Sequence, residues 1–128
     1  MVNTLEENII LLDQALNQNK AVIIDWKASV WDMVETIKDI LPHLNIIALQ
    51  EVQKYGDWYQ PFTLGDTQYD LKVESPAIIF AFFRIINQHL DNNHQTFVFL
   101  NTDDDNYNFI LIFTEELPRY LEMGFEEI

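Results

Sequence analysis

Two short apolar segments near the end of the chain, separated by an acidic turn, constrain the fold more than any other feature. Residues 96–100 (TFVFL) and 108–113 (NFILIF) are rich in aromatic and β-branched residues, which favour strands. Residues 101–107 between them contain Asp103, Asp104 and Asp105 in succession. This pattern predicts a hairpin of two buried strands with a solvent-exposed acidic tip.

Capping residues and helical periodicity predict two helices in the first third of the chain. Thr4 and Glu7 have the spacing of a capping box and precede apolar residues at helical spacing, which predicts a helix over about 4–18. Ser29 and Asp32 have the same spacing and predict the start of a second helix, which ends at a proline.

Two further helices are predicted later in the chain. Ser75-Pro76 is a cap followed by proline at the first helical position, and the apolar helix that it starts is expected to reach Leu90. Thr114 is expected to cap a short last helix with Glu115 and Glu116 in its first turn, where the helix dipole favours acids. Gly124 suits the end of that helix.

The remaining apolar segments predict strands, and the order of the elements predicts the fold class. Residues 21–26 and 45–52 are expected to be strands, and residues 62–73 a hairpin around Gly65-Asp66. Residues 55–62, between them, are expected to be an irregular aromatic loop. We therefore expect a single globular domain over residues 1–128, of the α+β (or α/β) class: a sandwich with one mixed sheet of about five or six strands and about four helices.

The charge balance excludes some partners and favours others. The chain of 128 residues has 7 basic and 21 acidic residues, a net charge of -14. Residues 1–64 carry a net charge of -5, and residues 65–128 carry -9. Such a charge repels nucleic acid and anionic membranes, and it attracts a basic protein. The alternative explanation of the charge is that it serves solubility alone. Since the chain has no cysteine and no signal peptide is visible, we expect a cytoplasmic protein.

Nucleophilic catalysis finds few candidate residues. The only serines, Ser29 and Ser75, are better explained as helix caps, and there is no cysteine. No catalytic residue and no cofactor are therefore expected. Acid–base chemistry by a pair of carboxylates stays open, because 21 acidic residues offer many pairs and the sequence distinguishes none of them.

The acidic turn invites a comparison with metal sites. Asp104, Asn106, Asn108 and Glu115 match ligand positions of a calcium-binding loop, but Phe109 occupies the position that requires glycine. The apolar residues that follow make a far better strand than a hydrated loop. A looser magnesium site at residues 103–105 stays open, although the chain has no glycine-rich loop for a substrate phosphate.

A histidine metal site is a second possibility. His89, Asp91 and His94 lie close in sequence, but their spacing matches no standard zinc arrangement. We therefore predict no metal site.

Two stretches of the sequence resemble a known family. Residues 21–27 (AVIIDWK) and residues 101–113 (NTDDDNYNFILIF) resemble a bacterial domain family of unknown function that has a D-W-K strand end and a late aspartate-rich turn before an apolar strand. This resemblance implies no catalytic residue. In general character the chain is also similar to immunity proteins of bacterial polymorphic toxin systems, including contact-dependent growth inhibition. That similarity implies a small cytoplasmic protein that binds a cognate toxin and blocks it.

The sequence supports two hypotheses on function. In the first, the protein is an immunity protein that neutralises a basic toxin domain, such as a nuclease, through an acidic surface. Aromatic residues of segment 55–62 would add anchors, unless they only cover an edge of the core. The residues expected to bind the partner are Asp103, Asp104, Asp105, Tyr107, Glu115, Glu116, Tyr55, Asp57, Trp58 and Tyr59. The alternative is a small carboxylate- or magnesium-dependent enzyme or regulator.

Overall fold

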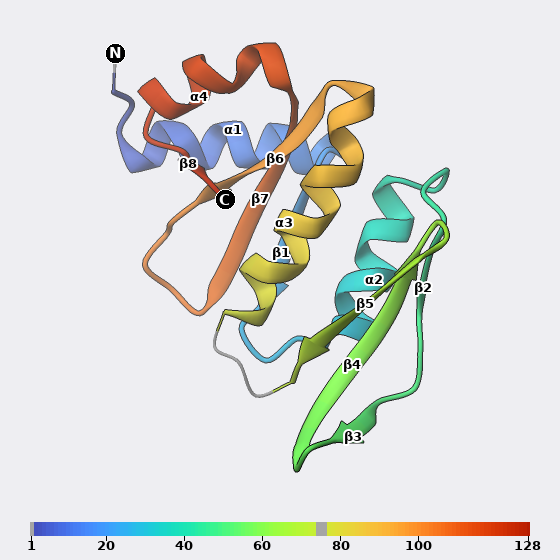
Figure 1. Cartoon of the computed structure of the whole chain (residues 1–128). Coiled ribbons are helices and arrows are strands. Elements are labelled where there is room, and N and C mark those ends of the chain that lie inside the picture. Colours follow the sequence, from blue (N-terminus) through green and yellow to red (C-terminus); the bar gives the residue numbers. More distant parts are fainter. Residues whose placement is uncertain (1, 74–76) are drawn as a thin grey trace. The chain divides into compact units, whose positions relative to one another are not determined.

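The computed structural model describes residues 2–73 and 77–128 (Figure 1). Within these residues it contains four α-helices and eight strands, which confirms the α+β class. The strands form two sheets of four, and every strand pair is antiparallel, so the expected single mixed sheet is corrected. The chain divides into two compact units, a first unit of residues 1–26 and 83–128, and a second unit of Lys27–Phe82.

The first unit is built on an antiparallel sheet with the strand order β1-β7-β6-β8. Its elements are α1 (Leu5–Asn17), β1 (Ala21–Asp25), the part of α3 (Ile78–Leu90) from Phe83 onward, a 3-10 turn (Asp91–Asn93), β6 (Gln95–Leu100), β7 (Asn106–Phe113), a second 3-10 turn (Thr114–Glu116), α4 (Leu117–Glu122) and β8 (Glu126–Glu127). The predicted hairpin is confirmed, and β7 begins at Asn106, so Asn106 and Tyr107 belong to the strand and not to the turn.

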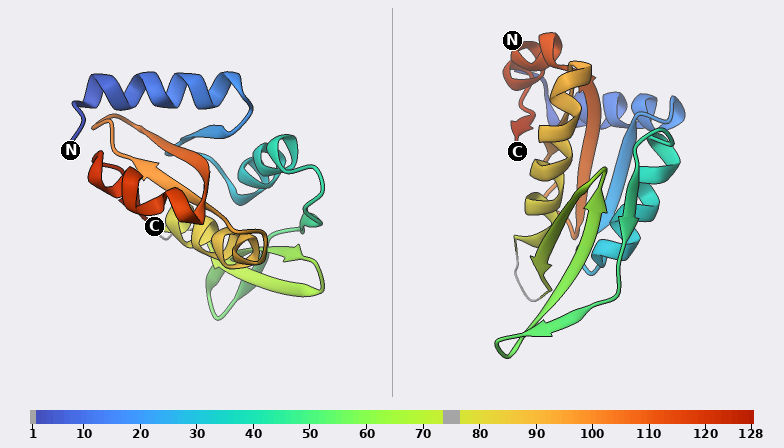
Figure 2. Two further views of the ribbon diagram at one scale, coloured as in Figure 1. Left: turned by 90° about the horizontal axis from the view of Figure 1, so that it is seen from above. Right: turned by 45° about the vertical axis from the view of Figure 1, so that its right-hand side comes forward.

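The two faces of this sheet are covered by different helices. Because side chains alternate along a strand, neighbouring residues of β7 face opposite sides. Ile110 faces α1 and belongs to a core cluster. Phe109 faces the other way, where its ring stacks on Phe83 of α3 with centroids 3.9 Å apart. Figure 2 shows α1 on one side of this sheet and the C-terminal half of α3 on the other. The cluster under α1 consists of Leu12, Ala21, Val98, Leu100, Ile110, Ile112 and Phe125.

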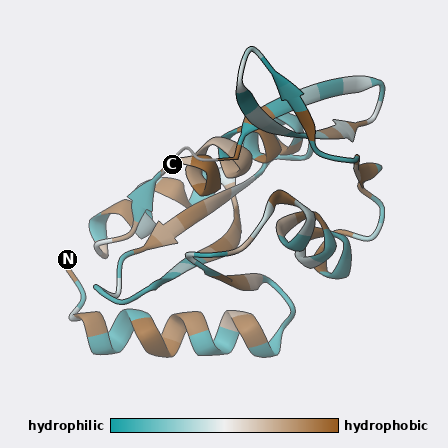
Figure 3. Ribbon diagram, turned by 90° about the horizontal axis from the view of Figure 1, so that it is seen from below, coloured by the Kyte–Doolittle hydropathy of each residue, from teal (hydrophilic) through white to brown (hydrophobic). Residues whose placement is uncertain are grey.

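The first helix begins where its capping residues predict. The Glu7 N–H donates to the Thr4 hydroxyl at 3.2 Å, and the Thr4 N–H donates to the Glu7 carboxylate at 3.0 Å. Apolar and polar residues alternate around α1, as the colours of Figure 3 show. Asn8 on this helix is buried and donates to the Met123 carbonyl at 2.9 Å, so α1 also holds the end of α4.

Asn87 on α3 completes the edge of β6 beyond the short strand β8. The Phe97 N–H donates to the Asn87 side-chain oxygen at 2.7 Å, and the Asn87 amide donates to the Phe97 carbonyl at 3.2 Å. These are the two bonds that a neighbouring strand would make. Since β8 pairs with Val98 and Phe99, the Asn87 amide takes the next bonding position along the edge.

The second unit is a meander of strands covered by a helix. Its elements are α2 (Val30–Ile40), β2 (Ile46–Ala48), β3 (Val52–Lys54), β4 (Asp57–Leu64), β5 (Thr67–Lys72) and the part of α3 up to Phe82. The central strand β4 pairs with β2 and β3 along one edge and with β5 along the other (Figure 1). Helix α2 packs against β2 and β4. Ser29 and Asp32 form the predicted capping box at its start.

The prediction of an irregular loop over residues 55–62 is wrong. Most of this segment is the central strand β4, and the turn before it contains only Tyr55 and Gly56. Both turn residues have positive φ, 52° and 85°, as in the two-residue hairpin turns that match strand twist. The hairpin predicted over residues 62–73 is confirmed, with Gly65 at φ 61° in its turn.

The predicted strand over residues 45–52 is interrupted, and the cause is a proline on the facing strand. Leu49 lies between β2 and β3 and donates its N–H to the Pro61 carbonyl at 3.0 Å. Pro61 has no N–H to return to the Leu49 carbonyl. The buried side chain of Gln60 donates to that carbonyl instead, which holds the interrupted edge against β4.

Three predictions about where helices start and end have different outcomes. The prediction that Thr114 caps the last helix is wrong, because its side chain makes no capping hydrogen bond. The last helix is preceded by a 3-10 turn, in which the Phe113 N–H donates to the Glu116 carboxylate at 3.2 Å. Gly124 has a φ of 106°, in agreement with its predicted place after the helix. The predicted start at Ser75-Pro76 lies outside the described residues, and the helix itself is present as α3.

Candidate functional site

Pairing between β1 and β7 brings together residues 21–27 and residues 101–113, the two stretches on which the family resemblance rests. Asp25 lies opposite Asn106, and the Trp26 N–H donates to the Asp105 carbonyl at 3.0 Å. The Trp26 side chain is 55% exposed. The end of the first strand therefore places an aromatic residue directly beside the acidic turn of residues 101–105.

Local hydrogen bonds shape this turn. The Asp103 N–H donates to the side chain of Asn101, and the Asn106 N–H donates to the side chain of Asp104, both at 2.9 Å. Asp103 has a φ of 58°, a left-handed conformation that aspartate and asparagine tolerate better than most residues. Asp104 thus has a structural role. The exposed carboxylates of Asp103 and Asp105 make no hydrogen bond or ion pair within residues 2–73 and 77–128.

The base of the turn is packed and hydrogen-bonded. Asn108 is buried and donates to the Thr102 hydroxyl at 3.0 Å and to the Leu100 carbonyl at 3.3 Å. On the opposite face of β7, the half-buried Tyr107 packs against Phe99, with ring centroids 6.0 Å apart. The acidic turn therefore projects from a well-supported strand pair, which suits a preformed binding surface.

The negative charge of the protein is concentrated in the first unit. This unit has 3 basic and 13 acidic residues, a net charge of -10, whereas the second unit has 4 and 8, a net charge of -4. In the first unit, Arg119 forms an ion pair with Glu116 at 2.8 Å. The carboxylates of Asp103 and Asp105 therefore stand in a strongly negative unit and are available to a basic partner.

Glu115 and Glu116 do not share a patch with the aspartates. Strand β7 separates the acidic turn at its start from these two residues after its end, a distance of about 24 Å for the seven steps from Asn106 to Phe113 at ~3.4 Å each. Glu116 is also engaged within the protein, since its two carboxylate oxygens accept from Phe113 and Arg119. Glu115 is exposed.

The aromatic candidates lie in the second unit, on and beside β4. Tyr55 is fully exposed at the tip of the β3–β4 hairpin, and Trp58 is 46% exposed. Tyr59 is half-buried, and Asp57 forms an ion pair with Lys72 at 3.5 Å. Trp58 and Tyr59 are neighbours in β4 and therefore face opposite sides of its sheet. All four residues belong to a different unit from the acidic turn.

A second ion pair crosses the same face of β4. Lys54 on β3 donates to Asp70 on β5 at 2.9 Å. This hydrogen bond and the charge of Asp70 raise the pKa of Lys54, and the bond from Lys54 lowers the pKa of Asp70. Two lysines and two aspartates therefore balance each other around Tyr59, and this face offers less net charge to a basic partner than the acidic turn does.

The metal alternatives find no support in the described geometry. The calcium-loop reading is excluded because residues 106–113 form a continuous strand, as the apolar pattern predicted. Among residues 2–73 and 77–128, no group of three or more histidines, aspartates or glutamates is arranged to hold a metal ion. No helix in this described part is long and apolar enough to cross a membrane.

Sequence reasoning missed Trp26 and Asn101 as parts of the site. The sequence predicts Trp26 as the last residue of a strand over 21–26, yet Trp26 lies just after β1 and is exposed beside Asp105. The D-W-K stretch was the available signal for Trp26, but its neighbour Asp105 is about 80 residues away in the chain, so the sequence does not show that the two are adjacent. Asn101 could have been recognised by its spacing from Asp103, which suits a side-chain-capped turn.

Comparison with known proteins gives a family and no activity. A family model described as "Domain of unknown function (DUF6630)" matches residues 3–126. No curated protein and no solved structure matches the chain.

Proposed function

This chain belongs to a family described only as a domain of unknown function, so we propose a function from its residues: it binds a basic protein partner through the acidic turn and Trp26. One observation carries the proposal, namely the placement of an exposed tryptophan beside the exposed carboxylates of Asp103 and Asp105. Carboxylates pair with lysine and arginine, and an indole ring adds cation–π contacts and buried area.

The proposed partner is a toxin domain, and the proposed role is its neutralisation in the cytoplasm. The chain is similar in general character to bacterial immunity proteins, and a net charge of -10 on the first unit suits a basic target such as a nuclease. Long-range attraction would speed the encounter, while Trp26 would slow dissociation as a buried anchor.

The proposal is tested by co-expressing the protein with the product of the adjacent upstream gene and measuring binding kinetics. The triple variant Asp103→Asn, Asp104→Asn, Asp105→Asn removes three charges and keeps the turn, since asparagine tolerates positive φ and its side-chain oxygen can still accept from Asn106. We expect the association rate to fall roughly tenfold at low salt, with a weaker dependence on salt.

A matched control removes three acidic charges elsewhere in the first unit. Glu6→Gln, Asp13→Asn and Glu126→Gln alter exposed residues that make no described side-chain hydrogen bond. The control should change the association rate less than the turn variant does. Trp26→Ala should raise the dissociation rate by about thirtyfold, as for an anchor worth about 2 kcal/mol. Equal effects of the two triple variants, or no complex with the neighbouring gene product, would refute the proposal.

A further inference from the structure

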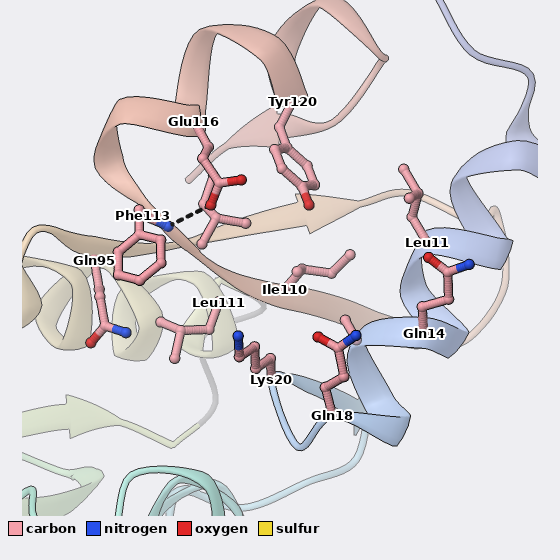
Figure 4. A pocket seen from close by; sticks show the side chains of 12 residues that line it. Leu11, Gln14, Gln18, Lys20, Gln95, Ile110, Leu111, Phe113, Glu116 and Tyr120 are labelled. Atoms are coloured by element: carbon pink, nitrogen blue, oxygen red, sulfur yellow. Dashed lines mark hydrogen bonds between the residues drawn. The ribbon is translucent and has the colours of Figure 1, made fainter.

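A second feature of the first unit, at the opposite end of β7 from the acidic turn, has the character of a ligand site. It is a cavity of about 220 Å³ between α1, the end of β7 and α4 (Figure 4). That volume is below the roughly 300–1,000 Å³ of sites for drug-sized ligands, so the cavity suits a small molecule. Its apolar lining includes Leu11, Ile110 and Ile112.

One residue that lines this cavity, Leu111, has a backbone carbonyl that accepts no hydrogen bond in the part of the chain that the structure describes. The Leu111 N–H donates to the Lys20 carbonyl at 2.7 Å, as in the first rung of the β1–β7 ladder. In such a rung the Lys20 N–H would return to the Leu111 carbonyl. It donates instead to Ala15 at the end of α1, at 2.8 Å. The Leu111 carbonyl is therefore available to a donor from a ligand.

The same edge cannot accept an extended peptide. The next bonding position along β7 is the N–H of Phe113, and the Glu116 carboxylate already accepts from it. A strand added here would need that N–H as well as the Leu111 carbonyl. The edge therefore offers one acceptor, which fits a single donor group on a small ligand.

The side chains around the cavity define its charge. Glu116 is neutralised by Arg119, and the Lys20 ammonium has no ion pair among the described residues, so Lys20 is the uncompensated charge in the lining. Figure 4 shows Lys20 and the Tyr120 hydroxyl on different sides of the cavity. The amides of Gln14, Gln18 and Gln95 also line it, and each makes no side-chain hydrogen bond within the part of the chain that the structure describes.

We propose that this cavity binds a small carboxylate that also carries a hydrogen-bond donor, such as a hydroxy acid. Lys20 pairs with the carboxylate, the Leu111 carbonyl accepts from the hydroxyl, and the glutamine amides satisfy the remaining polar atoms. The apolar lining contacts a short carbon chain. The site is independent of the proposed partner-binding turn, since the length of β7 separates them.

Three related compounds test each part of this assignment by NMR, with the amide signals of residues 20 and 111 and the glutamine side chains as reporters. 2-Hydroxybutyrate should bind with a Kd on the order of 1 mM, which is reasonable for so few atoms. Butyrate lacks the donor and should bind about fivefold more weakly. 2-Hydroxybutyramide lacks the charge and should bind at least roughly tenfold more weakly.

Two lysine variants complete the test. Lys20→Met keeps the side chain up to the position of Cε and removes only the ammonium group, and it should weaken 2-hydroxybutyrate binding by at least about tenfold. Lys38→Met removes a lysine of the second unit that pairs with Glu35, and it should leave the Kd within about twofold. The assignment is overturned if the three compounds bind alike, if Lys20→Met binds as well as the wild type, or if the shifts spread over all basic residues.

Discussion

Replacement of Gln60 by leucine should destabilise the second unit, because this side chain supplies a hydrogen bond that the backbone cannot. The N–H and C=O of one strand residue point to the same edge, and the Pro61 C=O accepts from Leu49. The missing N–H of Pro61 would therefore have served the Leu49 carbonyl. The Gln60 amide serves it instead, and Gln60→Leu leaves it without a donor.

The size of the effect follows from burial. An orphaned buried acceptor costs about 1–3 kcal/mol. Leu49 is half-buried, which gives water some access to its surroundings, while Gln60 is 4% exposed. Leucine also has no buried amide to satisfy, which recovers part of the loss. We expect Gln60→Leu to lower the free energy of unfolding by about 1–2 kcal/mol.

Pro61→Ala should rescue the variant, since it restores the missing N–H on the edge that faces Leu49. In the Pro61→Ala background, Gln60→Leu should cost about 1 kcal/mol less than in the wild type. The effect of Pro61→Ala on the unfolded chain enters both arms of this double-mutant cycle and cancels.

Urea denaturation followed by circular dichroism and by tryptophan fluorescence measures the four free energies of unfolding, and coincident curves justify a two-state treatment. Gln53→Leu is the control, because Gln53 is exposed on β3 and should change stability by less than about 0.5 kcal/mol. An equal cost of Gln60→Leu with proline and with alanine at position 61 would refute the reasoning.

Three further outcomes follow from single contacts. Asn87→Leu should lower the free energy of unfolding by about 1–3 kcal/mol and promote dimers through the open edge at Phe97, which denaturation and light scattering would detect. Tyr55→Asn should raise the free energy of unfolding by about 0.5–1 kcal/mol, because asparagine tolerates a φ of 52° better, and an unchanged midpoint in urea would contradict this. The hydrogen bond from Lys54 lowers the pKa of Asp70 below its ordinary 3.8, so the stabilising contribution of Asp70 is present above that pH and is lost as the pH falls through the folded pKa. Lys54→Met should therefore reduce the loss of unfolding free energy in this acidic range, which acid titrations would measure.

Elements that depend on neighbouring residues were predictable from the sequence. The capping boxes of α1 and α2 were correct, because each joins residues three positions apart. The hairpin at Gly65 was also correct, since a two-residue turn sets its own register. The prediction of an aromatic loop over residues 55–62 was wrong because Tyr59 and Phe62 lie in β4, whose partner strands precede it and follow it in the sequence. Pro61 also disguised this strand, because proline is uncommon in a central strand.

The candidate site divides in the same way. The sequence by itself determined that residues 103–105 form an exposed acidic turn before a buried strand, because local turn chemistry and the apolar pattern both act over a few residues. Only the tertiary structure decided which residues adjoin that turn. Pairing of β1 with β7 brings Trp26 to Asp105 and leaves Glu115 at the far end of the strand. Contacts between residues so distant in sequence depend on the packing of the whole unit, and no local pattern encodes them.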